Sequence, residues 1–155
     1  MNSLVIYDSL YGNTEKIARE MGRVLGAVDV VSVGMVKMEQ LKGVDLLVVG
    51  SPTQRLQMTR AMKAFLAKIP AGALEGVQVA TFDTRLPERT IKKNAILAFF
   101  VKMYGFAADP IAKGLAARGG CLAARPEGFF VEGMEGPLVA GELERAAEWA
   151  RKLLA

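Results

Sequence analysis

Residues 5–18 read VIYDSLYGNTEKIA, and this stretch decides the fold. Residues 4–7 form an apolar run of strand length, whereas residues 15–25 place apolar side chains three and four positions apart, which is helical periodicity. Residues 8–14 join the two segments and are mostly small or polar. The stretch therefore predicts a strand that runs through a short polar loop into an amphipathic helix.

Apolar runs and stretches of helical periodicity alternate along the rest of the chain, a pattern typical of a parallel sheet with helices on both faces. The chain of 155 residues contains no internal repeat and no low-complexity linker, so residues 1–155 are predicted to form a single α/β domain. Further strands are predicted at residues 28–33, 46–49, 77–82 and 121–123, and further helical segments at residues 36–41, 62–69, 111–118 and 143–154.

The composition excludes several kinds of chemistry. The absence of histidine removes Ser-His and Cys-His mechanisms, and a single cysteine, Cys121, excludes an internal disulfide and a four-cysteine cluster. Cys121 lies in a predicted strand and is expected to be a core residue. We therefore assign neither a catalytic side chain nor a metal site.

Charge and the start of the chain favour a cytoplasmic protein that does not bind nucleic acid. The net charge of +4 comes without a run of lysine and arginine, so it does not indicate a nucleic-acid surface. The first strand begins at Leu4, which leaves no room for a secretion signal. We expect a cytoplasmic location and no transmembrane segment.

The connection between the predicted fourth and fifth strands contains an additional apolar helical segment. Residues 95–101 are apolar without a break, so a helix there cannot bury all of its apolar surface against one sheet. The segment is too short to span a membrane. It could cover the ligand site, form a homodimer contact through residues 91–106, or lie on a membrane surface, an option kept open by Lys92, Lys93 and Lys102.

The loop after the first strand has the composition of a phosphate site. Ser9 and Thr14 offer hydroxyl donors, and Gly12 lets the backbone close on an anion. The N–H groups at the start of a helix are unpaired and lie at its positive end. The alternative is that Ser9 and Thr14 only cap the helix. Two more polar loops, at residues 50–56 and 83–86, follow the predicted third and fourth strands and meet the first at one sheet edge, where ligands of α/β proteins bind.

Residues 5–18 resemble the signature of the flavodoxin family, and residues 50–53, GSPT, are similar to its second flavin loop. The resemblance implies a doubly wound five-stranded parallel sheet of order 2-1-3-4-5, with FMN as cofactor. The residues implied to bind FMN are Ser9, Leu10, Tyr11, Gly12, Asn13 and Thr14 in the first loop, Pro52, Thr53, Gln54, Arg55 and Leu56 in the second, and Phe82, Asp83, Thr84 and Arg85 in the third. The second loop carries no aromatic residue, so weak stacking on the flavin ring is expected.

The resemblance implies an FMN-dependent electron carrier rather than a stand-alone enzyme. Many flavodoxins are acidic, whereas this chain is basic, so an acidic redox partner protein is expected. One alternative is an FMN-dependent reductase of quinones or similar acceptors, although the sequence shows no nicotinamide site. The other is a flavodoxin-like binding or regulatory module without flavin.

Overall fold

A computed structural model describes residues 1–54 and 57–155. Its strands form one parallel sheet of order β2-β1-β3-β4-β5, with β6 paired to β4, which confirms the predicted doubly wound topology. β1 lies between β2 and β3, with Val5 between Val30 of β2 and Val48 of β3. The strands are β1 (Ser3–Tyr7), β2 (Asp29–Ser32), β3 (Leu46–Pro52), β4 (Gln78–Arg85), β5 (Cys121–Leu122) and β6 (Glu127–Phe130).

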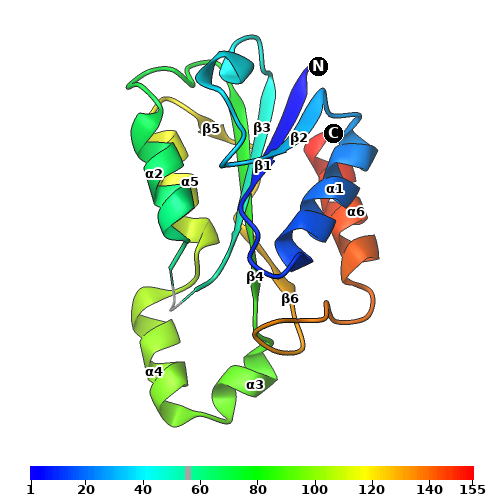
Figure 1. Ribbon diagram of the computed structural model, residues 1–155, viewed down its shortest axis with the longest axis vertical. Helices are drawn as coiled ribbons and strands as arrows, with labels where there is room; N and C mark the ends of the chain where they lie inside the picture. The colour runs from blue at the N-terminus through cyan, green and yellow to red at the C-terminus, as the bar shows by residue number, and fades with distance from the viewer. Residues whose placement is uncertain (55–56) are drawn as a thin grey trace.

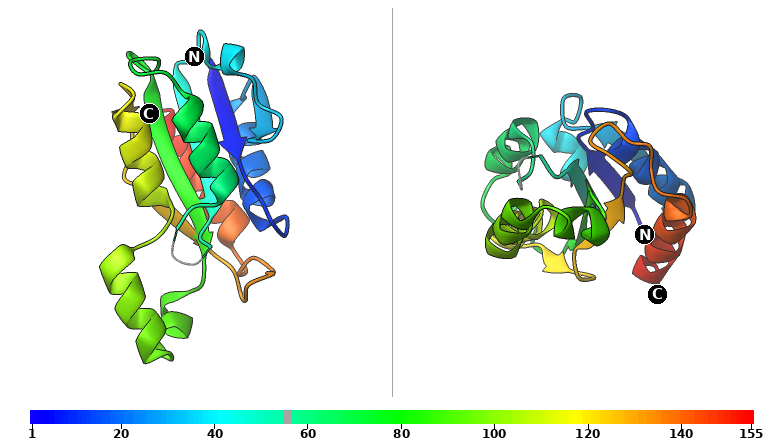
Figure 2. Two further views of the ribbon diagram at one scale, coloured as in Figure 1. Left: turned by 60° about the vertical axis from the view of Figure 1, so that its left-hand side comes forward. Right: turned by 90° about the horizontal axis from the view of Figure 1, so that it is seen from below.

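Helices cover both faces of the sheet (Figure 1), and the view from below shows three layers (Figure 2). α1 and α6 lie on one face and α2 and α5 on the other, while α3 and α4 extend beyond the end of the sheet. The helical segments are α1 (Asn13–Leu25), the short 3-10 helix η1 (Met38–Leu41), α2 (Arg60–Lys68), α3 (Glu88–Lys92), α4 (Ala95–Tyr104), α5 (Ala108–Ala116) and α6 (Glu142–Leu153).

The core consists of two apolar clusters separated by the sheet. Alternate residues of a strand point to opposite faces, so Leu47 and Val49 of β3 join the cluster under α2 and α5, whereas Val48 joins the cluster under α1 and α6. Phe82 and Phe129 are the largest fully buried side chains of the second cluster. Burial on both faces explains why the central strands are continuous apolar runs.

The fifth position of the sheet differs from the prediction, because two short strands share it. β5 pairs with the first two residues of β4, and β6 pairs with Phe82–Arg85 at its other end. β4 runs through Arg85 and is therefore long enough for two partners in succession. The expectation that Cys121 is a core residue is wrong: its side chain is exposed, since β5 forms the sheet edge.

The apolar segment between β4 and β5 forms helices of its own. The run Ala95–Ala116 has the length and the mean hydropathy, 1.4, of a membrane-crossing segment. It comprises two helices, however, because α4 ends at Tyr104, the next residue Gly105 has a left-handed φ of 73°, and α5 begins at Ala108. α5 buries Ile111 and Leu115 against the sheet, so the run is not one continuous exposed helix.

Candidate functional site

A cavity of about 460 Å³ opens where the carboxyl ends of β1, β3 and β4 meet. All three polar loops reach it, as the sheet topology predicted. Its lining includes Leu10, Tyr11, Asn13, Thr14, Pro52, Thr53, Gln54, Thr84 and Arg85 from the residues predicted from the sequence. It also includes Leu86, Ile91, Leu97, Val101, Phe106, Val131 and Met134, which are not among the residues that the family resemblance implied for FMN binding.

The first loop holds an open helix N-terminus toward this cavity. Gly12 precedes α1 with a φ of 91°, a left-handed conformation that glycine adopts without steric cost. The hydroxyl oxygen of Ser9 accepts the N–H groups of Gly12 at 3.1 Å and Glu15 at 3.4 Å, so Ser9 fixes the shape of the loop. Among the described residues, no acceptor bonds the N–H groups of Asn13 and Thr14.

Thr14 links the first loop to the end of β4. Its hydroxyl oxygen lies 2.8 Å from that of Thr84, and both side chains are buried at the wall of the cavity. A hydroxyl can donate one hydrogen bond and accept two, so this pair keeps capacity for a polar ligand atom. The arrangement combines free peptide donors, hydroxyls and the positive end of α1 without a lysine, which suits a phosphate group.

A segment after β6 closes over the first loop. The side-chain amide of Asn13 donates to the carbonyl oxygen of Glu135 at 3.1 Å, across 122 positions of sequence. Val131 pairs with Leu138 in an isolated bridge, which returns the chain toward β6, and Val131 and Met134 join the cavity lining. No local pattern in the sequence predicts this contact.

Asp83 connects the end of β4 to the start of α5. Its fully buried carboxylate pairs with Arg85 through two hydrogen bonds of 2.6 and 2.7 Å and accepts the N–H of Ala108 at 3.0 Å. Burial raises the pKa of this carboxyl above its ordinary value, while Arg85 and the Ala108 N–H oppose that rise. The helix therefore begins at Ala108, with its first N–H satisfied by β4, three residues before the predicted start at residue 111.

Arg85 also holds the aromatic wall of the cavity. Its guanidinium carbon lies 3.7 Å from the ring centroid of Phe106, in a cation–π contact. Phe106 comes from the connection between α4 and α5, and Leu97 and Val101 of α4 extend the same apolar wall. The unbroken apolar run at residues 95–101 was the signal for this wall, since the segment could not bury itself on the sheet.

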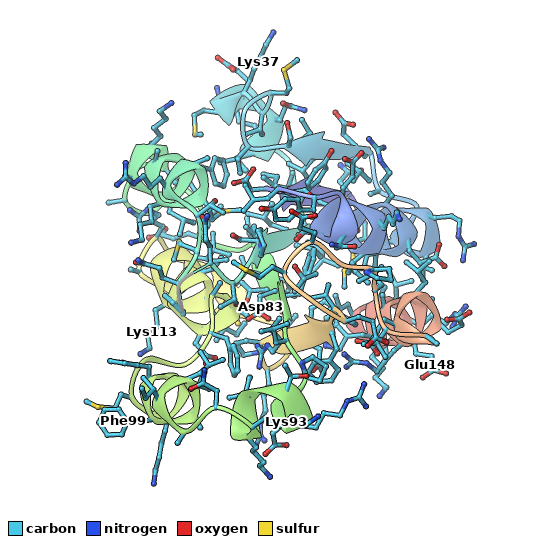
Figure 3. All side chains as sticks on the ribbon, turned by 60° about the horizontal axis from the view of Figure 1, so that its bottom comes forward. Lys37, Asp83, Lys93, Phe99, Lys113 and Glu148 are labelled. Atoms are coloured by element: carbon cyan, nitrogen blue, oxygen red, sulfur yellow. The ribbon has the colours of Figure 1, made fainter. Side chains whose placement is uncertain are left out.

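Two predicted site residues lie beneath the cavity instead of in its lining. Phe82 and Asp83 are fully buried, and Phe82 packs edge-on against Phe129 with ring centroids 6.0 Å apart. The reason is that β4 continues to Arg85 and does not end at Phe82, so the strand meets the cavity only at Thr84 and Arg85. Figure 3, which looks onto this edge, shows Asp83 at the centre of the molecule. Ser9 and Gly12 shape the first loop without lining the cavity, and Arg55 and Leu56 lie outside the described residues.

The cavity offers little for acid–base or metal chemistry. Its lining contains no carboxylate and no cysteine among the described residues. The described part of the chain also contains no group of three metal-ligating side chains. The described lining therefore consists of hydroxyl, amide and apolar side chains together with the Arg85 guanidinium.

Fold and site together define a class: a doubly wound α/β protein with a cavity and the N-terminus of α1 at the switch between β1 and β3. The sequence profile described as Flavodoxin domain matches residues 4–125. The chain therefore belongs to the flavodoxin family. No curated protein shows a significant sequence match to it.

Solved structures agree with this family. Flavodoxin 1 from Bacillus cereus superimposes with a TM-score of 0.77 at 16% identity, covering 99% of this chain and 97% of its own. A flavodoxin from the domain Archaea gives 0.71 at 22% identity with 100% of both chains covered. Rubredoxin oxygen:oxidoreductase from Desulfovibrio gigas gives 0.67 at 16% identity, covering 98% of this chain and 35% of its own. These likenesses show the fold.

Proposed function

We propose that this protein binds one FMN in the cavity and serves as an electron carrier. The observation that supports this most directly is the pair of free N–H groups at Asn13 and Thr14, at the positive end of α1 and beside an apolar cavity. A phosphate fits the polar end of the cavity and a flat apolar ring system fits the other end. The cavity volume of about 460 Å³ lies within the range of roughly 300–1,000 Å³ common for such ligands.

Two groups of residues in this chain would contact FMN, one at its phosphate and one at its ring system. The N–H groups of Asn13 and Thr14 and the Thr14 hydroxyl would hold the phosphate, while Phe106, Leu97 and Val101 would cover the ring and exclude water. FMN when bound supplies the redox chemistry, so the protein needs no acid or base in the cavity. Phe106 offers the aromatic contact that the second loop lacks.

The lining favours a carrier over a reductase. A reductase of quinones must also bind a reduced nicotinamide, and no described residue of the lining other than Arg85 is cationic and suited to its phosphates. Arg85 is already engaged with Asp83. We further propose that the carrier works in the cytoplasm, where the exposed thiol of Cys121 stays reduced, and that its net charge of +4 favours an acidic redox partner.

The test is a titration of purified protein with FMN and with riboflavin, which lacks the phosphate, followed by flavin fluorescence. We expect FMN to bind and its fluorescence to be quenched. Thr14→Val should weaken the binding of FMN by about tenfold or more and change the binding of riboflavin little. Thr90→Val makes the same exchange outside the cavity and serves as control. A protein that never quenches FMN, or equal losses for both flavins, would contradict the proposal, and rapid oxidation of reduced nicotinamide with a quinone present would favour a reductase.

A further inference from the structure

α4 has a second apolar face, which points away from the cavity. Leu97 and Val101 line the cavity, whereas Ile96, Phe99 and Met103 are exposed by 70%, 58% and 60%. These three exposed positions follow one another at intervals of three and four residues, so they form one stripe along the helix. We call them, with the neighbouring Phe100, the α4 stripe. Such a concentration of exposed apolar side chains indicates a surface that meets something apolar.

The stripe lies on a part of the molecule that projects beyond its body. α3 and α4 extend past the carboxyl edge of the sheet, while the other helices pack along its faces (Figure 1). Phe99 points outward at the rim of the molecule, and Lys93 lies at the rim of the same projecting unit (Figure 3). A broad surface could therefore approach the stripe without contacting the sheet or its covering helices.

Positive charge predominates in the projecting unit that carries the stripe. The only carboxylate within residues 88–105 is Glu88, which pairs with Lys92 at 3.1 Å. Lys93 and Lys102 have no carboxylate partner in the part of the chain that the structure describes. The basic residues of this unit are Arg89, Lys92, Lys93 and Lys102.

A second copy of the chain fits this surface poorly. A symmetric contact through the α4 stripe would also bring together the basic units of the two copies, and like charges oppose association. A soluble acidic protein would match the charge but would also need an apolar groove for two phenyl rings. An anionic bilayer matches both features, because lipid phosphates meet the lysines while the acyl boundary receives the apolar side chains.

We infer that α4 docks this protein reversibly on an anionic lipid surface, with the α4 stripe in the headgroup region and Lys92, Lys93 and Lys102 at the lipid phosphates. The helix is short, so apolar insertion and charge each supply part of the binding. The inference depends on the outer face of α4 and on Lys92, Lys93 and Lys102, none of which lines the cavity, so it is independent of FMN binding. Failure of one proposal therefore leaves the other standing.

The experiment is co-sedimentation of the full chain with vesicles of pure phosphatidylcholine and of phosphatidylcholine mixed with phosphatidylglycerol. We expect binding to the anionic vesicles that is about tenfold tighter than to the neutral ones and that weakens as salt is added. Phe99→Ser should weaken anionic binding by about tenfold, since one buried phenyl ring is lost. Replacing Lys92, Lys93 and Lys102 with Gln should remove the preference for the anionic lipid.

The control is Met35→Ser, which removes a side chain that is 74% exposed and lies outside α3 and α4. It should leave vesicle binding unchanged, and circular dichroism checks that each variant is folded. Absence of binding to anionic vesicles would overturn the inference, as would a Phe99→Ser variant that binds like the parent. Light scattering adds an independent criterion: a dimer that Phe99→Ser converts to monomer would show that a second copy covers the stripe.

Discussion

At the scale of single residues, Gly50 is fixed by the aromatic side chain beside it. A Cβ atom at position 50 would lie 2.1 Å from the ring of Phe82, far inside van der Waals contact. Phe82 itself cannot move easily, because it is fully buried against Phe129. The absence of a side chain at Gly50 thus lets β3 and β4 lie together directly beneath the cavity.

We expect Gly50→Ala to lower the free energy of unfolding by about 3 kcal/mol through overpacking. Phe82→Leu should relieve part of this clash. The double variant should therefore lose about 1 kcal/mol less unfolding free energy than the two single variants lose in sum. Urea unfolding of the parent and of each variant measures these free energies. Gly12→Ala is the matched control, because its added methyl meets nothing within 4 Å and costs only the left-handed conformation, about 1–2 kcal/mol. Strictly additive losses would contradict the steric explanation.

At the scale of elements, α5 depends on β4 for its start. The Asp83 carboxylate accepts the N–H of Ala108, the first residue of α5, at 3.0 Å, and the Thr53 hydroxyl after β3 accepts the N–H of the preceding Ala107 at 3.1 Å. The same carboxylate holds Arg85, which stacks on Phe106. One buried charge therefore joins a strand end, a helix start and the aromatic wall.

We expect Asp83→Asn to lower the free energy of unfolding by about 3–5 kcal/mol, because it leaves the Arg85 guanidinium without its charged partner. Urea unfolding at neutral pH is the measurement. Asp109→Asn removes an exposed carboxylate from the first turn of the same helix and should cost about 0.3–1 kcal/mol. If both variants lost the same stability, the loss would be explained by a general effect of charge at the helix end and not by the specific pairing of Asp83 with Arg85.

At the scale of the whole molecule, α6 is tied to the sheet edge through Glu142. Its carboxylate accepts the N–H of Phe130 in β6 at 2.7 Å and pairs with Arg145 at 2.7 Å. Burial opposes the charge on Glu142, but Arg145 and the Phe130 N–H together outweigh it, so the pKa of this carboxyl is lowered below its ordinary value. The folded state therefore holds this proton less tightly than the unfolded chain does.

The sign of the pH dependence follows from that lowered pKa. The stability contributed by Glu142 is present above the ordinary pKa of a glutamate, about 4.3, and is lost as the pH falls through the lowered value. Glu142→Gln should be less stable than the parent by about 1.5–3 kcal/mol at pH 7, and this difference should shrink below about pH 4. Thermal unfolding of the parent and of Glu142→Gln between pH 7 and pH values below about 4 measures this difference. Glu148→Gln, at an exposed position of α6, is the control, and a difference that does not change with pH would refute the assignment.

The sequence by itself determined the alternation of strands and helices, the order of the sheet through the family resemblance, and the loop that leads into α1. These features are local, because an apolar run followed by Gly12 and a helical periodicity carries its own signal. The three loops of the cavity were predicted from the sequence, whereas tertiary structure decided which other side chains complete its lining. Phe106, Leu97 and Val131 reach it from elements distant in sequence, and their positions follow from how α4 and the segment after β6 pack. The exposed edge position of Cys121 was decided in the same way, since burial depends on the neighbours that the fold supplies and not on the residue type alone.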